Sequence, residues 1–283
     1  MMANILITGC SSGFGYLSAL DLARRGERVF ATMRNLVRGQ ALTKIAISER
    51  LALTTHTLDV TDPMSVRRCV AEVLELGGKI DVLVNNAGYA QRGPIETLSD
   101  EEIHRQFDTN VTGIMRMVRT VVPHMRARNA GTIINLSSLS GLTGVPYEGA
   151  YSASKHAVEA ISQALRFELA ATSIRVLLIE PGAFETGFVN NAPVAADFNA
   201  AHPLWDEYQR FWSAAAQLTG GSRADPQAVV DAIRRAVIDP ETPFRQLVGA
   251  DVEFAVSLQE AAGLADLGPT IREILHLPAT GKH

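Results

Sequence analysis

The chain contains little cysteine, with only Cys10 and Cys69 in 283 residues. Neither lies in a Cys-x-x-Cys pair or a histidine-rich spacing, so a disulfide framework is excluded and no metal site is expected. Unpaired cysteines of this kind fit a reducing compartment. An apolar strand pattern begins by Ile5 and leaves no room for a signal peptide. We therefore expect a cytoplasmic protein.

Long apolar runs and a strong charge of either sign are also missing. No stretch of about 18 or more apolar residues occurs, so no segment is expected to span a membrane. The formal net charge of −4 gives no reason to expect nucleic acid or an acidic membrane surface as a partner. The chain does have 47% hydrophobic and 20% charged residues, which are ordinary values for a globular protein with a sizeable core.

Apolar segments of strand length alternate with segments of helical periodicity along the chain. This alternation predicts an α/β fold with one doubly wound, Rossmann-type parallel sheet of about seven strands, helices on both faces and right-handed crossovers. Residues 1–283 are interpreted as one domain, with 187–222 as an irregular insertion. The expected strands are 4–8, 28–33, 51–58, 81–85, 131–136, 175–180 and 244–248.

Capping signals mark three helix starts: Asp62 before Pro63, Ser99 with Glu102 three residues on, and Asp225 before Pro226. The expected helices are 16–25, 63–76, a long one at 99–128, one at 150–171, and a final one at 225–237.

A glycine-rich turn joins the first strand to the first helix. A strand, a turn of this kind and a helix in that order open a dinucleotide-binding unit, because glycine lets the backbone approach a pyrophosphate at the helix N-terminus. The spacing is Gly-xxx-Gly-x-Gly rather than Gly-x-Gly-xx-Gly, so the usual fingerprint is not met literally. The predicted cofactor contacts in this turn are Gly9, Ser11, Ser12, Gly13, Phe14 and Gly15.

The second strand ends at Met33 and is followed by Arg34, with no carboxylate until Glu49. A carboxylate at this point would bind the ribose hydroxyls of NAD, whereas an arginine can pair with the 2′-phosphate of NADP. We therefore expect NADP rather than NAD, and the alternative is that Arg34 is a solvated loop residue. Beyond the third strand, Asp59 and Val60 are placed at the adenine, with capping as the alternative role for Asp59.

Polar and small residues follow the other strands at their carboxyl ends, where open α/β sheets hold their ligands. Asn86, Ala87 and Gly88 follow the fourth strand, Ser138 follows the fifth, and Pro181, Gly182 and Thr186 follow the sixth. Asn110 falls inside the long helix at 99–128, where an asparagine is disfavoured. It indicates either a special backbone geometry or an exposed side chain.

Tyr151 and Lys155 lie four residues apart at the start of a helical segment, so both side chains share one face. A cation beside a phenol favours the phenolate and would lower the tyrosine pKa from its ordinary value of about 10. Such a pair is a suitable acid/base for interconverting an alcohol and a carbonyl. Two such residues also occur together on helix surfaces by chance.

Together these motifs resemble the short-chain dehydrogenases/reductases over about residues 4–187. The matching motifs are Thr8-Gly-xxx-Gly-x-Gly15, Asn85-Asn-Ala-Gly88, Asn110, Ser138, Tyr151-xxx-Lys155 and Pro181-Gly182…Thr186. The opening Thr-Gly-Cys-Ser-Ser-Gly and the Ala-Thr-Met-Arg of the second strand look like the branch that contains 17β-hydroxysteroid dehydrogenase type 1 and related NADP-linked ketoreductases. Phe14 departs from the family, which more often has a smaller aliphatic residue there.

The resemblance implies a role for each catalytic candidate. Tyr151 would be the general acid or base, and Lys155 would lower its pKa and bind the nicotinamide ribose. Ser138 would hold the substrate oxygen, and Asn110 would fix a water that joins Lys155 to solvent. Thr186 and the backbone near Gly182 would anchor the carboxamide. A small-molecule carbonyl or alcohol is the expected substrate.

Six aromatic residues, including both tryptophans of the chain, gather in the insertion: Phe188, Phe198, Trp205, Tyr208, Phe211 and Trp212. They indicate either a lid over a bulky apolar substrate, such as a steroid, retinoid or aryl ketone, or simple packing. The family resemblance implies a homodimer or homotetramer assembled through helices 99–128 and 150–171. An NAD-linked alcohol dehydrogenase and an NADP sensor without turnover are the competing hypotheses.

Overall fold

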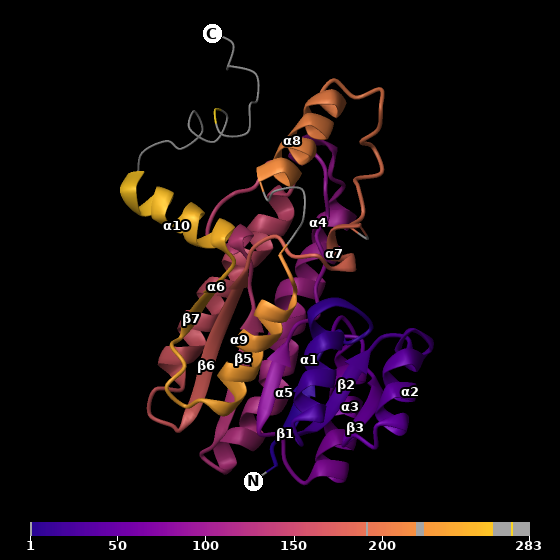
Figure 1. Ribbon diagram of the computed structural model, residues 1–283, viewed down its shortest axis with the longest axis vertical. Helices are drawn as coiled ribbons and strands as arrows, with labels where there is room; N and C mark the ends of the chain where they lie inside the picture. The colour runs from indigo at the N-terminus through magenta and orange to yellow at the C-terminus, as the bar shows by residue number, and fades with distance from the viewer. Residues whose placement is uncertain (1, 191, 219–223, 263–272, 274–283) are drawn as a thin grey trace.

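The computed structural model describes residues 2–190, 192–218, 224–262 and 273. Its centre is a parallel sheet of seven strands in the order β3-β2-β1-β4-β5-β6-β7 (Figure 1). The predicted α/β fold and strand count are confirmed. The strands are β1 (Asn4–Ile7), β2 (Arg28–Met33), β3 (Leu53–Thr57), β4 (Val82–Asn85), β5 (Gly131–Leu136), β6 (Ile174–Pro181) and β7 (Arg245–Val248).

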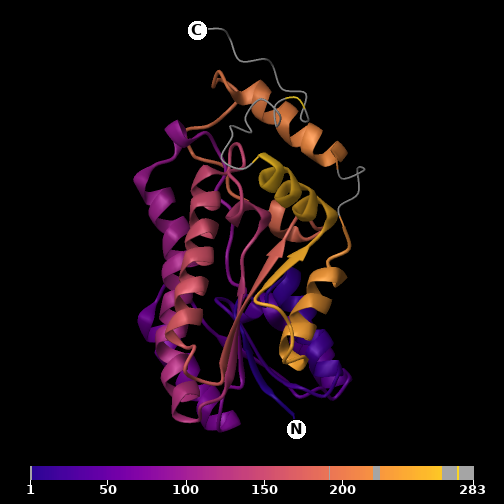
Figure 2. The same ribbon diagram turned by 90° about the vertical axis from the view of Figure 1, so that its left-hand side faces the viewer.

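Helices cover both faces of the sheet, which Figure 2 shows from its edge. The α-helices are α1 (Gly13–Arg24), α2 (Gln40–Ser48), α3 (Pro63–Gly77), α4 (Asp100–Phe107), α5 (Gly113–Ala127), α6 (Gly149–Glu168), α7 (Gly187–Asn190), α8 (Trp205–Leu218), α9 (Gln227–Ile238) and α10 (Ala250–Ala262). Shorter helical turns are η1 (Leu36–Gly39), η2 (Ile95–Thr97), η3 (Asp108–Thr112) and η4 (Leu139–Gly141).

The hydrophobic core has one layer on each face of the sheet, because successive side chains of a strand point to opposite faces. In β1, Ile5 and Ile7 pack with apolar residues of α1, α2 and α9. Leu6 lies between them in sequence and packs with α3, α5 and α6 on the other face. Burial on both faces explains why the central strands are apolar throughout.

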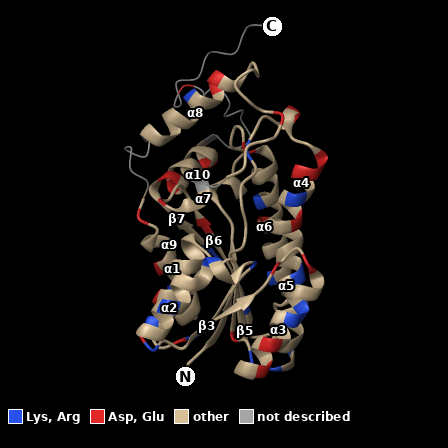
Figure 3. Ribbon diagram, turned by 90° about the vertical axis from the view of Figure 1, so that its right-hand side faces the viewer, with Lys and Arg blue, Asp and Glu red and all other residues tan. Residues whose placement is uncertain are grey.

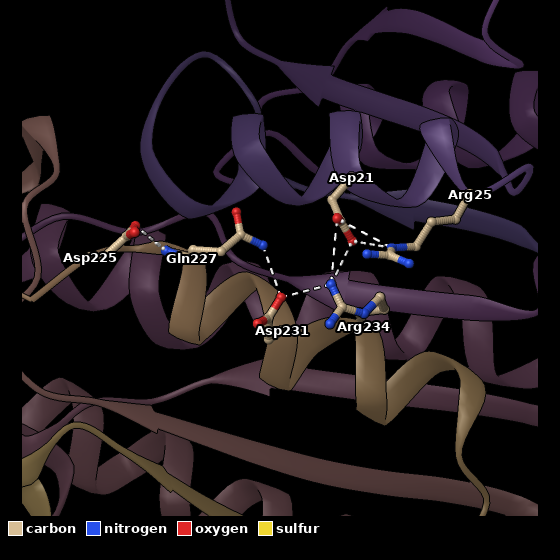
Figure 4. A network of polar contacts seen from close by, with 6 residues as sticks. All are labelled: Asp21, Arg25, Asp225, Gln227, Asp231 and Arg234. Carbon is tan, nitrogen blue, oxygen red and sulfur yellow. Dashed lines mark hydrogen bonds and ion pairs between the residues drawn. The ribbon is translucent and has the colours of Figure 1, made fainter.

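The predicted helix caps are confirmed. Asp62 accepts a hydrogen bond from the backbone N–H of Met64, and Ser99 forms a reciprocal capping box with Glu102. Asp225 accepts from the N–H of Gln227 at the start of α9 (Figure 4). In the same network Arg234 of α9 pairs with Asp21 of α1, so two helices on one face are joined by an ion pair.

Two helix predictions were wrong in part. The helix expected at 99–128 is interrupted by a π-helical turn at Asp108–Thr112, which separates α4 from α5. The helix expected to be the last is α9, and α10 follows it after β7. Strand boundaries also differ by one or two residues, as at β3, which was expected at 51–58 and spans Leu53–Thr57.

Charged residues of both signs are interspersed over the helices in Figure 3, as expected for a net charge of −4. In the described ranges, no helix is both long and apolar enough to cross a bilayer. Within the same residues, no group of three or more His, Cys, Asp or Glu side chains is arranged to hold a metal ion.

Candidate active site

The glycine-rich turn after β1 brings the backbone close to the end of β4. Gly9 has a φ of +74°, and a Cβ atom there would lie 2.8 Å from Ala87 Cα. A Cβ on Gly15 would lie 2.4 Å from Asn86 Nδ2 and 2.7 Å from the Gly9 carbonyl oxygen. Only glycine fits these positions, because any larger residue would collide with fixed atoms. The glycine spacing therefore sets a close approach between two strand ends.

The N-terminus of α1 is open toward the same turn. Ser12 is the N-cap residue, and its side chain makes no capping hydrogen bond. The first backbone N–H groups of a helix have no intrahelical partner and favour an anion. Ser11, Ser12, Gly13 and Phe14 thus offer the donors that a pyrophosphate needs. Phe14 itself packs edge-on against Phe184, with ring centroids 5.8 Å apart.

A set of polar side chains that we call the strand-end network ties together the carboxyl ends of β1, β4 and β5. Its members are Thr8, Asn85, Asn86, Asn135 and Ser162. Thr8 Oγ1 accepts from the N–H groups of Asn86 and Ala87, both at 3.0 Å. Asn86 Nδ2 donates to the Thr8 carbonyl at 2.8 Å, and Asn85 donates to Asn135 at 2.8 Å. Asn135 in turn donates to Ser162 of α6 at 2.8 Å.

The residues predicted at the adenosine end lie at the ends of β2 and β3. Arg34 is exposed directly after β2. Burial raises the pKa of Tyr89, and the nearby charges of Arg105 and Arg34 offset this only in part. Asp59 accepts from the N–H and hydroxyl of Thr61 at 2.9 and 2.7 Å. It therefore shapes the loop, while Asp62 caps α3, and Val60 is buried beside it.

Ser138 and Tyr151 meet at the carboxyl end of β5. Ser138 is the N-cap of η4 and accepts from the N–H of Ser140 at 3.2 Å. Tyr151 lies in the first turn of α6 and is buried. Burial raises the pKa of the Tyr151 phenol, a hydrogen bond with Ser138 lowers it, and the Glu148 charge raises it again. The net direction is upward, so the phenol is held in its protonated form.

Lys155 lies one turn after Tyr151, and its Nζ is 5.7 Å from the centre of the Tyr151 ring. Nζ donates to the Leu136 carbonyl at 2.7 Å. Burial lowers the Lys155 pKa to about 8, while the Glu159 charge raises it. Desolvation is the largest influence on the Tyr151 pKa in this structure, and a lowering by Lys155 stays a prediction. The two side chains do share one buried helix face.

Asn110 lies in the π-helical turn, so the special backbone geometry indicated by the sequence is confirmed. Its Nδ2 donates to the Tyr89 carbonyl at 3.0 Å and to Ser154 Oγ at 3.1 Å. Its Oδ1 accepts from the Tyr89 N–H at 3.2 Å. π-Helical turns frequently occur at functional sites. Here the turn places the asparagine side chain between the end of β4 and α6, next to Gly88.

The segment Pro181–Thr186 leaves β6 and passes in front of the glycine-rich turn, where Thr186 faces Gly13. Asp251 of α10 accepts from the N–H of Ala183 at 2.7 Å and fixes this segment. The Gly182 N–H donates to the Val248 carbonyl at 3.0 Å. Thr186 Oγ1 accepts from the N–H of Phe188 at 3.3 Å. The predicted carboxamide segment is thus held by two elements distant in sequence.

The aromatic residues of the insertion form a cluster above the carboxyl ends of the strands, where Figure 1 shows α8. We call it the aromatic cap: Tyr147, Phe198, Trp205, Tyr208, Phe211 and Trp212. Tyr147 precedes the site helix with a φ of 62° and contacts the rings of Tyr208 and Phe211. Tyr208 and Phe211 are buried, so packing is confirmed for them. Residues 191 and 219–222 of the predicted insertion lie outside the described residues.

A buried ion pair joins this cap to the site helix. Arg92 Nε donates to Glu148 at 3.0 Å, and the Arg92 guanidinium lies 3.8 Å from the centre of the Trp212 ring. Glu148 is three residues before Tyr151, and burial raises its pKa. Phe188 lies on the other side of Tyr151, with ring centroids 5.8 Å apart. The Tyr151 ring therefore lies next to the ring of Phe188, and the buried Arg92–Glu148 pair lies at the start of the same helix.

Sequence reasoning missed a second charged cluster beside Lys155. Glu159 of α6 and Glu180 of β6 are both buried, and both pair with Arg245 of β7. Glu159 had a signal, because it continues the four-residue spacing of Tyr151 and Lys155 along one helix face. Glu180 and Arg245 had none, since their proximity depends on the pairing of β6 with β7. The Arg92–Glu148 pair also had no signal, because the two residues are 56 positions apart in the sequence.

Comparisons with known proteins agree with this geometry. The family model for short chain dehydrogenases matches residues 3–196. The 3-ketodihydrosphingosine reductase of Bacteroides thetaiotaomicron is 36% identical over 249 residues, or 88% of each chain. Estradiol 17-beta-dehydrogenase 1 of Rattus norvegicus is 34% identical over 257 residues, or 85% of this chain and 72% of the other. The branch expected from the sequence is confirmed.

The solved structures carry the same fold. A short-chain dehydrogenase from Streptomyces avermitilis matches with a TM-score of 0.81 and 33% identity over 98% of both chains. Structures with this fold hold NADPH in one case and NAD in another. With motif, fold and relatives in agreement, this chain belongs to the short-chain dehydrogenase/reductase family, whose members are NAD(P)-linked oxidoreductases acting on CH–OH groups.

Proposed function

We propose that this protein is an NADPH-dependent reductase that interconverts a ketone and a secondary alcohol on a bulky apolar substrate. The observation that carries the proposal is the meeting of Ser138, Tyr151 and Lys155 at the carboxyl end of β5, beside the glycine-rich turn. Open α/β sheets bind their ligands at this edge. The nicotinamide would supply hydride, a reaction that protein side chains do not provide.

Each candidate residue has a role that its surroundings support. Tyr151 keeps its proton at neutral pH, which is the form that can protonate an alkoxide as it develops. Ser138 hydrogen-bonds this phenol and can also hold the substrate oxygen. Lys155 would bind the nicotinamide ribose, and Asn110 would position a water beside it. Pro181, Gly182 and Thr186 would hold the carboxamide.

NADP is the preferred cofactor in this proposal. Arg34 is exposed at the end of β2, and residues 35–48 contain no carboxylate that would repel a 2′-phosphate. We expect Arg34→Ala to reduce the preference for NADPH over NADH about tenfold, from the loss of one charge-assisted contact. Arg38→Ala, another exposed arginine of the same loop, is the matched control. An unchanged preference in Arg34→Ala would contradict the assignment.

The substrate class follows from the aromatic side chains around the phenol. Phe188 lies beside Tyr151 and is 38% exposed, so its ring is available to a ligand. The relatives named above include a reductase of 3-ketodihydrosphingosine and a dehydrogenase of estradiol, both apolar molecules. We interpret residues 1–283 as one domain in which 187–222 covers this substrate.

The proposed assembly is a homodimer or homotetramer. A groove of about 630 Å³ runs between α5 and α6, and its apolar lining includes Val118, Val122 and Leu165. Phe167 is 79% exposed at the end of α6. An exposed aromatic ring beside an apolar groove is typical of a contact surface.

Cys10 and Cys69 are both free and buried, which fits the proposed location in the reducing cytoplasm.

The test is a spectrophotometric screen of NADPH oxidation over ketones of increasing size. We expect turnover to rise from small aliphatic ketones to steroid, retinoid, long-chain or aryl ketones. Tight binding of NADPH without hydride transfer to any of them would overturn the proposal and favour a sensor. Oxidation of a secondary alcohol to its ketone with NAD+ as the hydride acceptor, in preference to NADP+, would favour an NAD-linked dehydrogenase.

A further inference from the structure

Three buried ionisable side chains follow one another along the inner face of α6. Tyr151, Lys155 and Glu159 are spaced by four residues, which stacks their side chains on one face. All three are buried. The catalytic assignment proposed above accounts for the first two, and it leaves Glu159 without a role. A carboxylate buried one turn from a buried ammonium calls for a physical explanation.

Glu159 belongs to a cluster that spans three elements lying side by side in Figure 1. Arg245 of β7 donates to Glu159 Oε2 at 2.6 Å and also to Glu180 Oε1 of β6. One guanidinium therefore serves two carboxylates. The remaining oxygens, Glu159 Oε1 and Glu180 Oε2, are buried and find no hydrogen-bond partner among the described residues. The cluster carries one more acidic than basic group, unless Lys155 is counted.

A shared proton completes the cluster. Burial and the Glu159 charge, partly offset by Arg245, together raise the Glu180 pKa to about 7. Protonated Glu180 can donate to Glu159, which gives these oxygens a partner. Burial lowers the Lys155 pKa, and the charge of Glu159, one helical turn away, raises it in part. The cluster therefore places a carboxylate one helical turn from the Lys155 ammonium and opposes its loss of charge.

We propose that Glu159, held between Glu180 and Arg245, keeps the Lys155 side chain charged in its buried place and so acts as a positioning residue for the Lys155–Tyr151 pair. Tyr151 and Glu159 lie on the same face of α6 as Lys155, and Glu159 pairs with Arg245 of β7, which also pairs with Glu180 of β6. Strand β5 presents the Leu136 carbonyl that accepts from Nζ. Without Glu159, this carbonyl alone would oppose desolvation.

The inference rests on the proposed function only for the catalytic importance of Lys155, and its test needs neither cofactor nor substrate. The lysines of the chain are Lys44, Lys79, Lys155 and Lys282, so protein labelled with 13C-lysine gives few side-chain NMR signals. The Lys155 signal is assigned by its loss in Lys155→Met. Its 13Cε shift is followed from about pH 6 to 11, a range that spans the ordinary lysine pKa.

In Glu159→Gln we expect the Lys155 titration midpoint to fall by about one pH unit, since one adjacent negative charge is lost. The signals of exposed Lys44 and of Lys79 should not move, and Glu75→Gln, which removes an exposed carboxylate from α3, should leave Lys155 unchanged. Glu159→Asp keeps the charge and should restore most of the midpoint. An unchanged Lys155 midpoint in folded Glu159→Gln would overturn the inference.

Glu159→Leu provides a second route if Glu159→Gln does not fold, because it removes the same charge without burying an amide. The Lys155 midpoint should again fall, and an unchanged midpoint would overturn the inference. If hydride transfer is found, the limb of the kcat/KM pH profile that depends on Lys155 should shift with the NMR midpoint. If none is found, the proposed function fails while the titration still decides the inference.

Discussion

The strand-end network and the aromatic cap face the same site but are held together by different forces. The network consists of short, buried hydrogen bonds between adjacent strands, such as those of Thr8 with Asn86 and of Asn85 with Asn135. The cap consists of ring contacts and one buried ion pair, Arg92–Glu148. Hydrogen bonds require one geometry, because an unmatched buried donor or acceptor is costly. Ring contacts tolerate many arrangements.

This difference explains why the sequence motifs of the family lie at the strand ends and not in the aromatic cap. A change of side chain in the strand-end network breaks pairing between strands, and with it the positions of Ser138 and the glycine-rich turn. A change in the aromatic cap alters the shape above Tyr151 and leaves the strand ends in place. Three experiments would sharpen or break this comparison.

The largest effect is expected for Tyr151→Phe. Loss of the proton donor should reduce kcat about a thousandfold, while NADPH binding, measured by fluorescence, stays close to that of the wild type. Tyr208→Phe removes the same atom from the aromatic cap and should change kcat only slightly. Substantial activity in Tyr151→Phe would show that another group transfers the proton. Equal losses in both variants would show that cap and site are one unit.

The second effect concerns the ion pair between the cap and α6. Arg92→Met leaves Glu148 buried without its cation, which should cost about 3–5 kcal/mol. We expect this loss as faster hydrogen exchange in α8, with β1 and β4 still protected. Arg105→Met breaks an exposed pair with Glu101 and should cost less than about 1 kcal/mol. Equal loss of protection in α8 and the central strands would contradict a separately held cap.

The third effect is a pH dependence of stability that comes from the charged cluster beside Lys155. Burial and the Glu159 charge, partly offset by Arg245, raise the Glu180 pKa from 4.5 to about 7. The protonated form is therefore favoured by folding, and its contribution is complete below pH 4.5 and lost as the pH rises through 7. Over this pH window the free energy of unfolding of the wild type should fall by on the order of 2 kcal/mol relative to that of Glu180→Gln. Urea unfolding at several pH values measures it.

The controls for this experiment are simple. Glu75→Gln removes an exposed carboxylate and should follow the wild-type pH profile. A stability difference between wild type and Glu180→Gln that stays constant with pH would show that Glu180 does not take up a proton on folding.

Much of the fold follows from local pattern. The strand β2 begins and ends where expected, at Arg28 and Met33, because an apolar run between polar residues specifies a buried strand. The caps at Asp62 and Ser99 follow from side-chain chemistry within a few residues. The helix α10 was missed. Its contact with the site is made by Asp251 across 68 residues, and local spacing contains no such information.

The sequence alone determined the family and the parallel sheet and predicted Ser138, Tyr151 and Lys155 as site residues, because these depend on periodicity and on fixed short spacings. Only the tertiary structure decided their electrostatics. Burial raises the Tyr151 pKa. The packing of α6, β6 and β7 brings Glu180 and Arg245 to Glu159. Desolvation and the register of β6 with β7 are properties of the packed molecule. They arise between residues that the chain separates widely.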